Sequence, residues 1–98
     1  MYKLIIKPLA ETDATEAAKW YNNALEGLGD EFLLALETKM NAIKQNPNQF
    51  SIVHKSIRRA LTERFPYGIY FIAEKSTIYI LAIIHTRRNP KIWRKRNI

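Results

Sequence analysis

The feature that most constrains the fold is an unbroken apolar run, IYILAII, at residues 78–84. A run of this length matches a strand and is far too short to cross a membrane. Because side chains alternate between the two faces along a strand, the run places apolar residues on both faces. A strand that is covered on both faces lies inside a sheet rather than at its edge. The sequence therefore predicts a central strand over residues 77–86.

Three further strands are predicted around the central one. Residues 2–7 are rich in β-forming residues and stop at Pro8, which cannot donate to a sheet ladder. Residues 57–65 and 67–74 form the other two strands, and residues 75–76 make a tight turn into the central strand. Gly68 is expected to permit curvature or the close approach of another backbone. Residues 46–56 are predicted to be a loop.

Between the first two strands the apolar spacing becomes helical. One helix is predicted to start near residue 10, with Thr12 or Asp13 at its cap or in its first turn. A second runs over 30–45, and Gly27 with Gly29 makes the corner between them. The predicted fold is therefore α+β in the order β-α-α-β-β-β. A helical hairpin packs on one face of a four-stranded, mainly antiparallel, curved sheet, in a single domain over residues 1–98.

Charge is divided unevenly along the chain. Residues 1–50 hold five lysines and seven acidic residues, for a net charge of −2, whereas residues 51–98 hold eleven basic and two acidic residues, for a net of +9. Such an asymmetry predicts a positive face that attracts phosphates or acidic proteins. Every arginine lies in the second half, and arginine favours bidentate contact with phosphate or carboxylate.

Cysteine is absent, so no disulfide or thiolate metal site is possible, and a cytoplasmic protein is expected. The two histidines, His54 and His85, have no acidic cluster beside them and make no case for a metal site. We therefore expect no metal, no cofactor and no membrane segment.

His85 is the candidate acid–base residue. It follows the apolar run and has the strand parity of Tyr79, Leu81 and Ile83. A histidine titrates near neutral pH and suits proton transfer, and the arginines at 87–88 suit a phosphate. A histidine at the end of a strand is also commonly structural, bonding a nearby loop and fixing the exit of the tail.

Arginines and aromatic residues form the second group of candidates. In a strand over 57–65, Arg58 and Arg64 share one face and Arg59 lies on the other. The aromatic residues at 65–79 suit either base stacking or a sheet core. Trp93 is expected to clamp the C-terminal tail onto the fold while the tail's cations stay free. The candidate target-binding residues are Arg58, Arg59, Arg64, Arg87, Arg88, Lys91, Trp93 and Arg94.

The segments FPYGIYFI, residues 65–72, and IIHTRRNPKIW, residues 83–93, resemble the RelE/ParE superfamily of type II toxins. The HTRRNP run looks ParE-like, as in plasmid stabilisation toxins. This resemblance implies a bacterial growth-inhibiting toxin that is neutralised by a cognate antitoxin, on a separate chain, in a toxin–antitoxin hetero-oligomer. ParE-like members bind DNA gyrase, whereas RelE-like members cleave mRNA on the ribosome.

The residues that the resemblance carries over favour the gyrase reading. Arg87 matches a RelE arginine, but Trp93 stands where RelE has its catalytic tyrosine, and Gly68 stands where RelE has a second arginine. A toxin that binds its target without being an enzyme is therefore the leading hypothesis. A metal-independent, ribosome-dependent endoribonuclease is the alternative, with His85 as acid or base and Arg59, Arg87 and Arg88 on the scissile phosphate. A non-toxic nucleic-acid-binding module is the second alternative.

Overall fold

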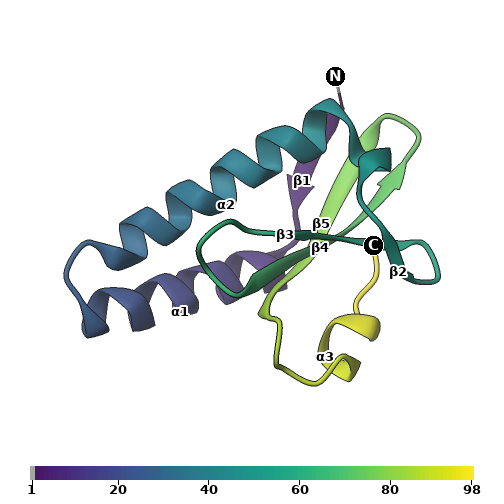
Figure 1. Cartoon of the computed structure of the whole chain (residues 1–98). Coiled ribbons are helices and arrows are strands. Elements are labelled where there is room, and N and C mark those ends of the chain that lie inside the picture. Colours follow the sequence, from purple (N-terminus) through teal and green to yellow (C-terminus); the bar gives the residue numbers. More distant parts are fainter. Residues whose placement is uncertain (1) are drawn as a thin grey trace.

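The computed structural model describes residues 2–98. Figure 1 shows two long helices side by side against a twisted sheet, with a short C-terminal helix, in yellow, well apart from them. In chain order the elements are β1 (Lys3–Ile6), α1 (Pro8–Ala24), α2 (Leu28–Gln45), the short 3₁₀ helix η1 (Pro47–Gln49), β2 (Ile52–His54), β3 (Ile57–Leu61), β4 (Tyr67–Glu74), β5 (Thr77–His85) and α3 (Lys91–Arg94).

The sheet confirms the predicted α+β architecture but has five strands instead of four. Its order is β1-β5-β4-β3-β2, so β5 is internal, as the apolar run predicts. β1 runs parallel to β5, and the other neighbours are antiparallel. The additional strand, β2, lies within the predicted loop 46–56. It is a three-residue edge strand without an apolar run, and it turns into β3 through Lys55, whose φ is +52°.

Two helix boundaries differ from prediction because of proline and glycine. Pro8 occupies the first turn of α1, where its missing N–H costs nothing, so one proline both ends β1 and begins the helix. Lys7 is therefore the N-cap residue, and Thr12 and Asp13 lie inside the helix. Gly27, with a φ of +87°, forms the corner, and Gly29 is already inside α2.

β3 is shorter than the predicted strand because Thr62 closes a turn. The buried Thr62 hydroxyl lies 2.8 Å from the carbonyl oxygen of Phe65 and 3.2 Å from that of Tyr67. Arg64 in this turn has a φ of +74°, which no strand residue adopts. Gly68, at the start of β4, leaves room for a ring, since a Cβ there would lie 3.0 Å from the Tyr70 side chain.

The sheet is covered on both faces. The larger core lies between the sheet and the α1–α2 hairpin and is built around Phe32, Ile43, Ile69 and Phe71. A smaller core lies on the opposite face, where Ile57, Tyr70, Leu81 and Ile84 pack with Trp93 of α3. This second face is therefore closed in part by the C-terminal helix.

A β-bulge in β5 decides which way its last residues point. Tyr70 pairs with Ala82 but Phe71 pairs with Ile80, so Leu81 is an extra residue in the ladder. Leu81 and Ala82 both join the smaller core, and the alternation resumes with Ile83 in the larger core. The predicted parity of His85 with Leu81 is therefore wrong: His85 lies with Ile83 on the hairpin face.

No helix within residues 2–98 combines the length and apolarity needed to span a membrane.

Candidate functional site

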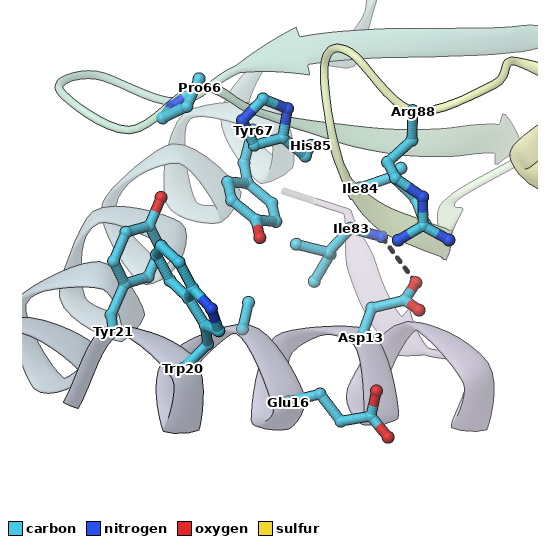
Figure 2. A pocket seen from close by; sticks show the side chains of 11 residues that line it. Asp13, Glu16, Trp20, Tyr21, Pro66, Tyr67, Ile83, Ile84, His85 and Arg88 are labelled. Atoms are coloured by element: carbon cyan, nitrogen blue, oxygen red, sulfur yellow. Dashed lines mark hydrogen bonds between the residues drawn. The ribbon is translucent and has the colours of Figure 1, made fainter. Parts of the chain in front are cut away.

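An open groove lies between α1 and the adjoining ends of β4 and β5 (Figure 2). Its volume is about 650 Å³. Trp20 and Tyr21 come from α1, Tyr67 from the start of β4, His85 from the end of β5, and Arg88 from the turn that follows. The groove thus combines aromatic rings, a phenol, an imidazole and a guanidinium, which are groups suited to binding or to proton transfer.

Tyr67 and His85 meet at the centre of this groove because their backbones pair directly in the sheet. Their rings approach edge to face, with centroids 5.4 Å apart. Burial raises the pKa of Tyr67, Tyr21 adds to that rise, and the charge of Arg88 opposes it. Tyr67 is therefore a protonated hydrogen-bond donor at neutral pH.

His85 is held by a local contact. Its Nδ1 accepts the backbone N–H of Arg87 at 3.1 Å, so the neutral ring carries its proton on Nε2. This is the geometry of a histidine that fixes the start of a turn, and it leaves Nε2 able to donate. Among residues 2–98 no group of three or more His, Cys, Asp or Glu side chains is arranged to hold a metal ion.

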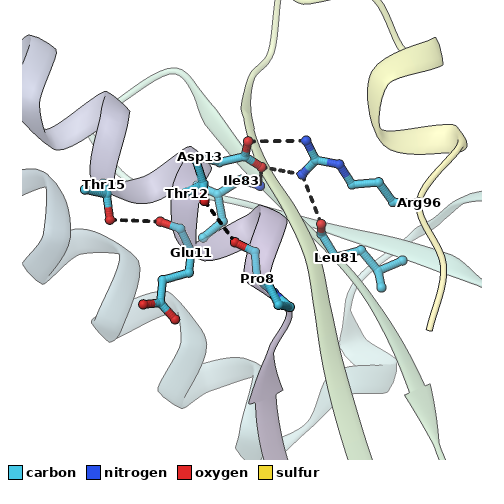
Figure 3. Close-up of polar contacts among 8 residues, drawn as sticks. All are labelled: Pro8, Glu11, Thr12, Asp13, Thr15, Leu81, Ile83 and Arg96. Carbon is cyan, nitrogen blue, oxygen red and sulfur yellow. Dashed lines mark hydrogen bonds and ion pairs between the residues drawn. The ribbon is translucent and has the colours of Figure 1, made fainter.

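Asp13 of α1 and Arg96 of the tail form an ion pair beside β5 (Figure 3). Their side chains are 16% and 14% exposed. The Asp13 carboxylate also accepts the Ile83 N–H at 3.0 Å, and Arg96 donates to the Leu81 carbonyl at 3.0 Å. β1 pairs with β5 only as far as Ile80, so these side chains satisfy backbone groups that lack a neighbouring strand.

This ion pair corrects one expectation about the tail and one about α1. Arg96 is not a free cation, and Asp13 is not a cap. One signal was present in the sequence: Asp13, Ala17 and Tyr21 follow one another at four-residue spacing, so an acidic residue stands on the stripe that faces the sheet. Trp20, 66% exposed on the rim of the groove, carries no comparable signal.

The three arginines of the predicted second strand lie in separate environments. Arg58 projects to the hairpin face and donates to the Phe50 carbonyl at 2.6 Å. Arg59 pairs with Tyr70 and projects to the opposite face. Arg64 follows the end of β3 and forms a 2.5 Å ion pair with Glu31 of α2. The predicted common face for Arg58 and Arg64 is therefore wrong, because the strand ends before Arg64.

The predicted cations after β5 divide between two places, since Arg88 lines the groove whereas Lys91 and Arg94 lie on α3. Arg87, Lys91, Arg94 and Lys95 are exposed, and their side chains make no hydrogen bond or ion pair with any other part of residues 2–98. We refer to these four cations as the basic surface. Trp93 lies beneath them with 5% exposure, stacked on Tyr70 at a centroid distance of 4.4 Å and an interplanar angle of 15°. It anchors α3, as predicted, and presents no ring surface to a partner.

The hairpin on one face of the sheet and the basic C-terminal half agree with the fold and charge expected from the RelE/ParE resemblance. A family model, "ParE toxin of type II toxin-antitoxin system, parDE", matches residues 4–90. The chain therefore belongs to the ParE family and is the toxin component of a type II toxin–antitoxin module.

The fold agrees with a solved structure, the chromosomal ParDE toxin–antitoxin system from P. aeruginosa. The two chains share 19% identity with a TM-score of 0.77, over 87% of this chain and 96% of the other. No curated protein sequence gives a significant match.

Proposed function

We propose that this toxin inhibits growth by binding DNA gyrase in the cytoplasm, and that it is not itself an enzyme. The observation that carries the proposal is the position of Trp93. It stands where the RelE resemblance would place a catalytic tyrosine, and it is buried against Tyr70. An indole N–H donates a hydrogen bond but transfers no proton near neutral pH. The exposed cations around Trp93 supply binding groups without acid–base chemistry.

The separation of the other nuclease candidates supports the same choice. A nuclease of the RelE type would need His85, Arg59, Arg87 and Arg88 around one phosphate. His85 faces the α1 side of the sheet through its pairing with Tyr67, whereas Arg59 projects to the opposite face. A general acid or base must lie within hydrogen-bond reach of the group it serves. One phosphate cannot meet both side chains across the sheet.

Gyrase inhibition is tested by adding purified toxin to purified gyrase, relaxed plasmid and ATP. Supercoiling of the plasmid is read on a gel. A parallel in vitro translation reaction is read for protein yield and mRNA cleavage. We expect supercoiling to be blocked and translation to continue. Arg87→Gln/Arg94→Gln should weaken the block, and the matched variant Lys3→Gln/Lys19→Gln, which removes two exposed cations elsewhere, should not. Cleaved mRNA together with normal supercoiling would replace gyrase by the ribosome as the target.

We also propose that a cognate antitoxin neutralises the chain by covering a second groove. Membership of the ParE family supplies the reason for a partner of this kind. The groove holds about 410 Å³ between β1, α1 and α2, and Leu4, Ile6, Leu33 and Met40 line it. Leu33 is 42% exposed there although it is apolar. An amphipathic segment laid into such a groove would bury these side chains.

The antitoxin proposal is tested by co-purifying the toxin with the product of each small reading frame found beside its gene. Leu33→Asp should weaken the complex at least about 10-fold, as loss of a buried apolar anchor does. Leu34→Asp is the matched control, since Leu34 is exposed on a different side of α2. Equal affinity of the two variants would place the antitoxin elsewhere on the toxin.

A further inference from the structure

The basic surface carries more positive charge than the fold uses. Its four cations lie within residues 87–95, and none has an acidic partner among residues 2–98. Three other arginines differ in this respect, since Arg64 and Arg96 are paired with acids and Arg58 donates to a loop carbonyl. A cluster of like charges without counter-charges is costly for folding and is ready to bind an anion.

The cations are held in a fixed arrangement. Lys91, Arg94 and Lys95 recur at helical spacing, so they project from one side of α3 and its C-cap. Trp93, stacked on Tyr70, pins this short helix to the sheet. Arg96 ties the chain down immediately after Lys95 by its ion pair with α1. The basic surface is therefore presented by an anchored segment, which lowers the entropy cost of binding.

The surroundings of these cations favour a phosphate backbone over a protein. Protein interfaces depend on buried aromatic or aliphatic anchors and are depleted in lysine. The segment 87–95 that carries the four cations exposes no large apolar side chain of its own. Contacts with DNA phosphates need only cations.

The same surroundings favour a duplex over a single strand. Single-stranded nucleic acids are bound by stacking their bases on exposed aromatic rings. Trp93, whose ring lies under the Arg94 guanidinium, and Tyr70, on which it stacks, are 5% and 2% exposed. They leave no platform for a base.

We infer that the basic surface binds the phosphate backbone of duplex DNA, so that the toxin contacts the DNA carried by gyrase as well as the enzyme. Only the part of this inference that concerns gyrase-bound DNA rests on the proposed gyrase target, since binding to a free duplex requires no gyrase. Four phosphate contacts predict a slope of about −3 to −4 for the logarithm of the binding constant against that of salt concentration. Affinity should therefore fall roughly 100-fold between about 50 and 200 mM salt.

The test is fluorescence anisotropy of a labelled mixed-sequence duplex DNA with the full-length toxin and no gyrase. Arg87→Gln/Lys91→Gln/Arg94→Gln should reduce the salt slope to about −1 and remove most of the affinity at low salt. The matched control is Lys3→Gln/Lys19→Gln/Lys75→Gln, which removes the same charge from exposed positions outside the basic surface and should keep the slope.

Three results would overturn the inference: no binding to the duplex, equal losses in the two triple variants, or tighter binding to a single-stranded RNA of equal length. Gyrase inhibition is measured separately on the same proteins. Duplex binding without any effect on supercoiling leaves the DNA contact standing and removes the gyrase target. Loss of gyrase inhibition in the basic-surface variant, without duplex binding by the native toxin, shows a protein contact and overturns the inference while the gyrase proposal stands.

Discussion

Replacing Arg96 by methionine tests how much the ion pair with Asp13 stabilises the toxin. The change keeps an apolar stem of similar length but removes the guanidinium. The Asp13 carboxylate, 16% exposed, then loses its ion-pair partner, and the Leu81 carbonyl loses its hydrogen-bond donor. Removing one partner of a fully buried ion pair costs about 3–5 kcal/mol. Because both side chains keep some contact with water, we expect a loss of about 2–3 kcal/mol in the free energy of unfolding. In a chain of this size that lowers Tm by roughly 10–20 °C.

The measurement is urea or thermal unfolding followed by circular dichroism. Lys95→Met is the matched control, since its side chain is exposed and unpaired, and it should change stability by less than about 0.5 kcal/mol. In a double-mutant cycle, Asp13→Asn combined with Arg96→Met should cost less than the sum of the two single changes, because no unpaired charge remains. If Arg96→Met were no worse than Lys95→Met, the ion pair would contribute nothing and the argument for an anchored tail would fail.

Three further perturbations test the packing and the groove. Gly29→Ala should lower the free energy of unfolding by about 1–3 kcal/mol in chemical denaturation although alanine favours helix, because its Cβ would lie 2.0 Å from the Ala18 carbonyl oxygen and 2.6 Å from Asn22. Lys75→Asn should raise it by roughly 0.5–1 kcal/mol in the same assay, since asparagine accepts a φ of +57° more readily. Burial raises the pKa of Tyr67. The stability that the protonated phenol contributes is therefore complete below the unfolded pKa near 10, and it is lost as pH rises through the folded pKa. Tyr67→Phe should flatten this alkaline loss of stability when unfolding is measured as a function of pH.

The sequence predicted those parts of the fold that depend on long periodic patterns. The apolar run at 78–84 located the internal strand, and the helical spacing of residues 10–45 located the hairpin. It missed β2, because a three-residue edge strand gains its order from pairing with β3 and carries no pattern of its own. It also extended β3 too far, since the end of that strand is decided by Thr62 bonding across its turn.

The site was harder to predict because a single extra residue reverses the faces of a strand. The bulge at Leu81 puts His85 on the opposite face from Tyr79 and Leu81, with which it was predicted to share a face, and places it in the groove beside Tyr67. No local feature of the sequence marks that bulge, which exists where β1 has ended and α1 crosses the edge of β5. Composition did identify the C-terminal cations, because charges without a partner stay at the surface whatever fold the chain adopts. It did not distinguish Arg96, whose role depends on an acidic residue 83 positions away.

The bulge and the tail together explain how so small a toxin holds an exposed basic surface in place. Beyond Ile80, β5 loses β1 as a neighbour, and its free backbone groups turn to Asp13 and Arg96 instead of to another strand. Asp13 and Arg96 thus cover the free edge of β5 where β1 has ended. Because they also pair with each other, the same contacts fix the C-terminal tail. The segment that carries the cations begins at the end of β5, is held within by Trp93 stacked on Tyr70, and is held after Lys95 by the ion pair of Arg96. Trp93 and Arg96 thus hold this segment in place while its four cations keep no acidic partner among residues 2–98, and an anchored segment loses less entropy when it binds an anion.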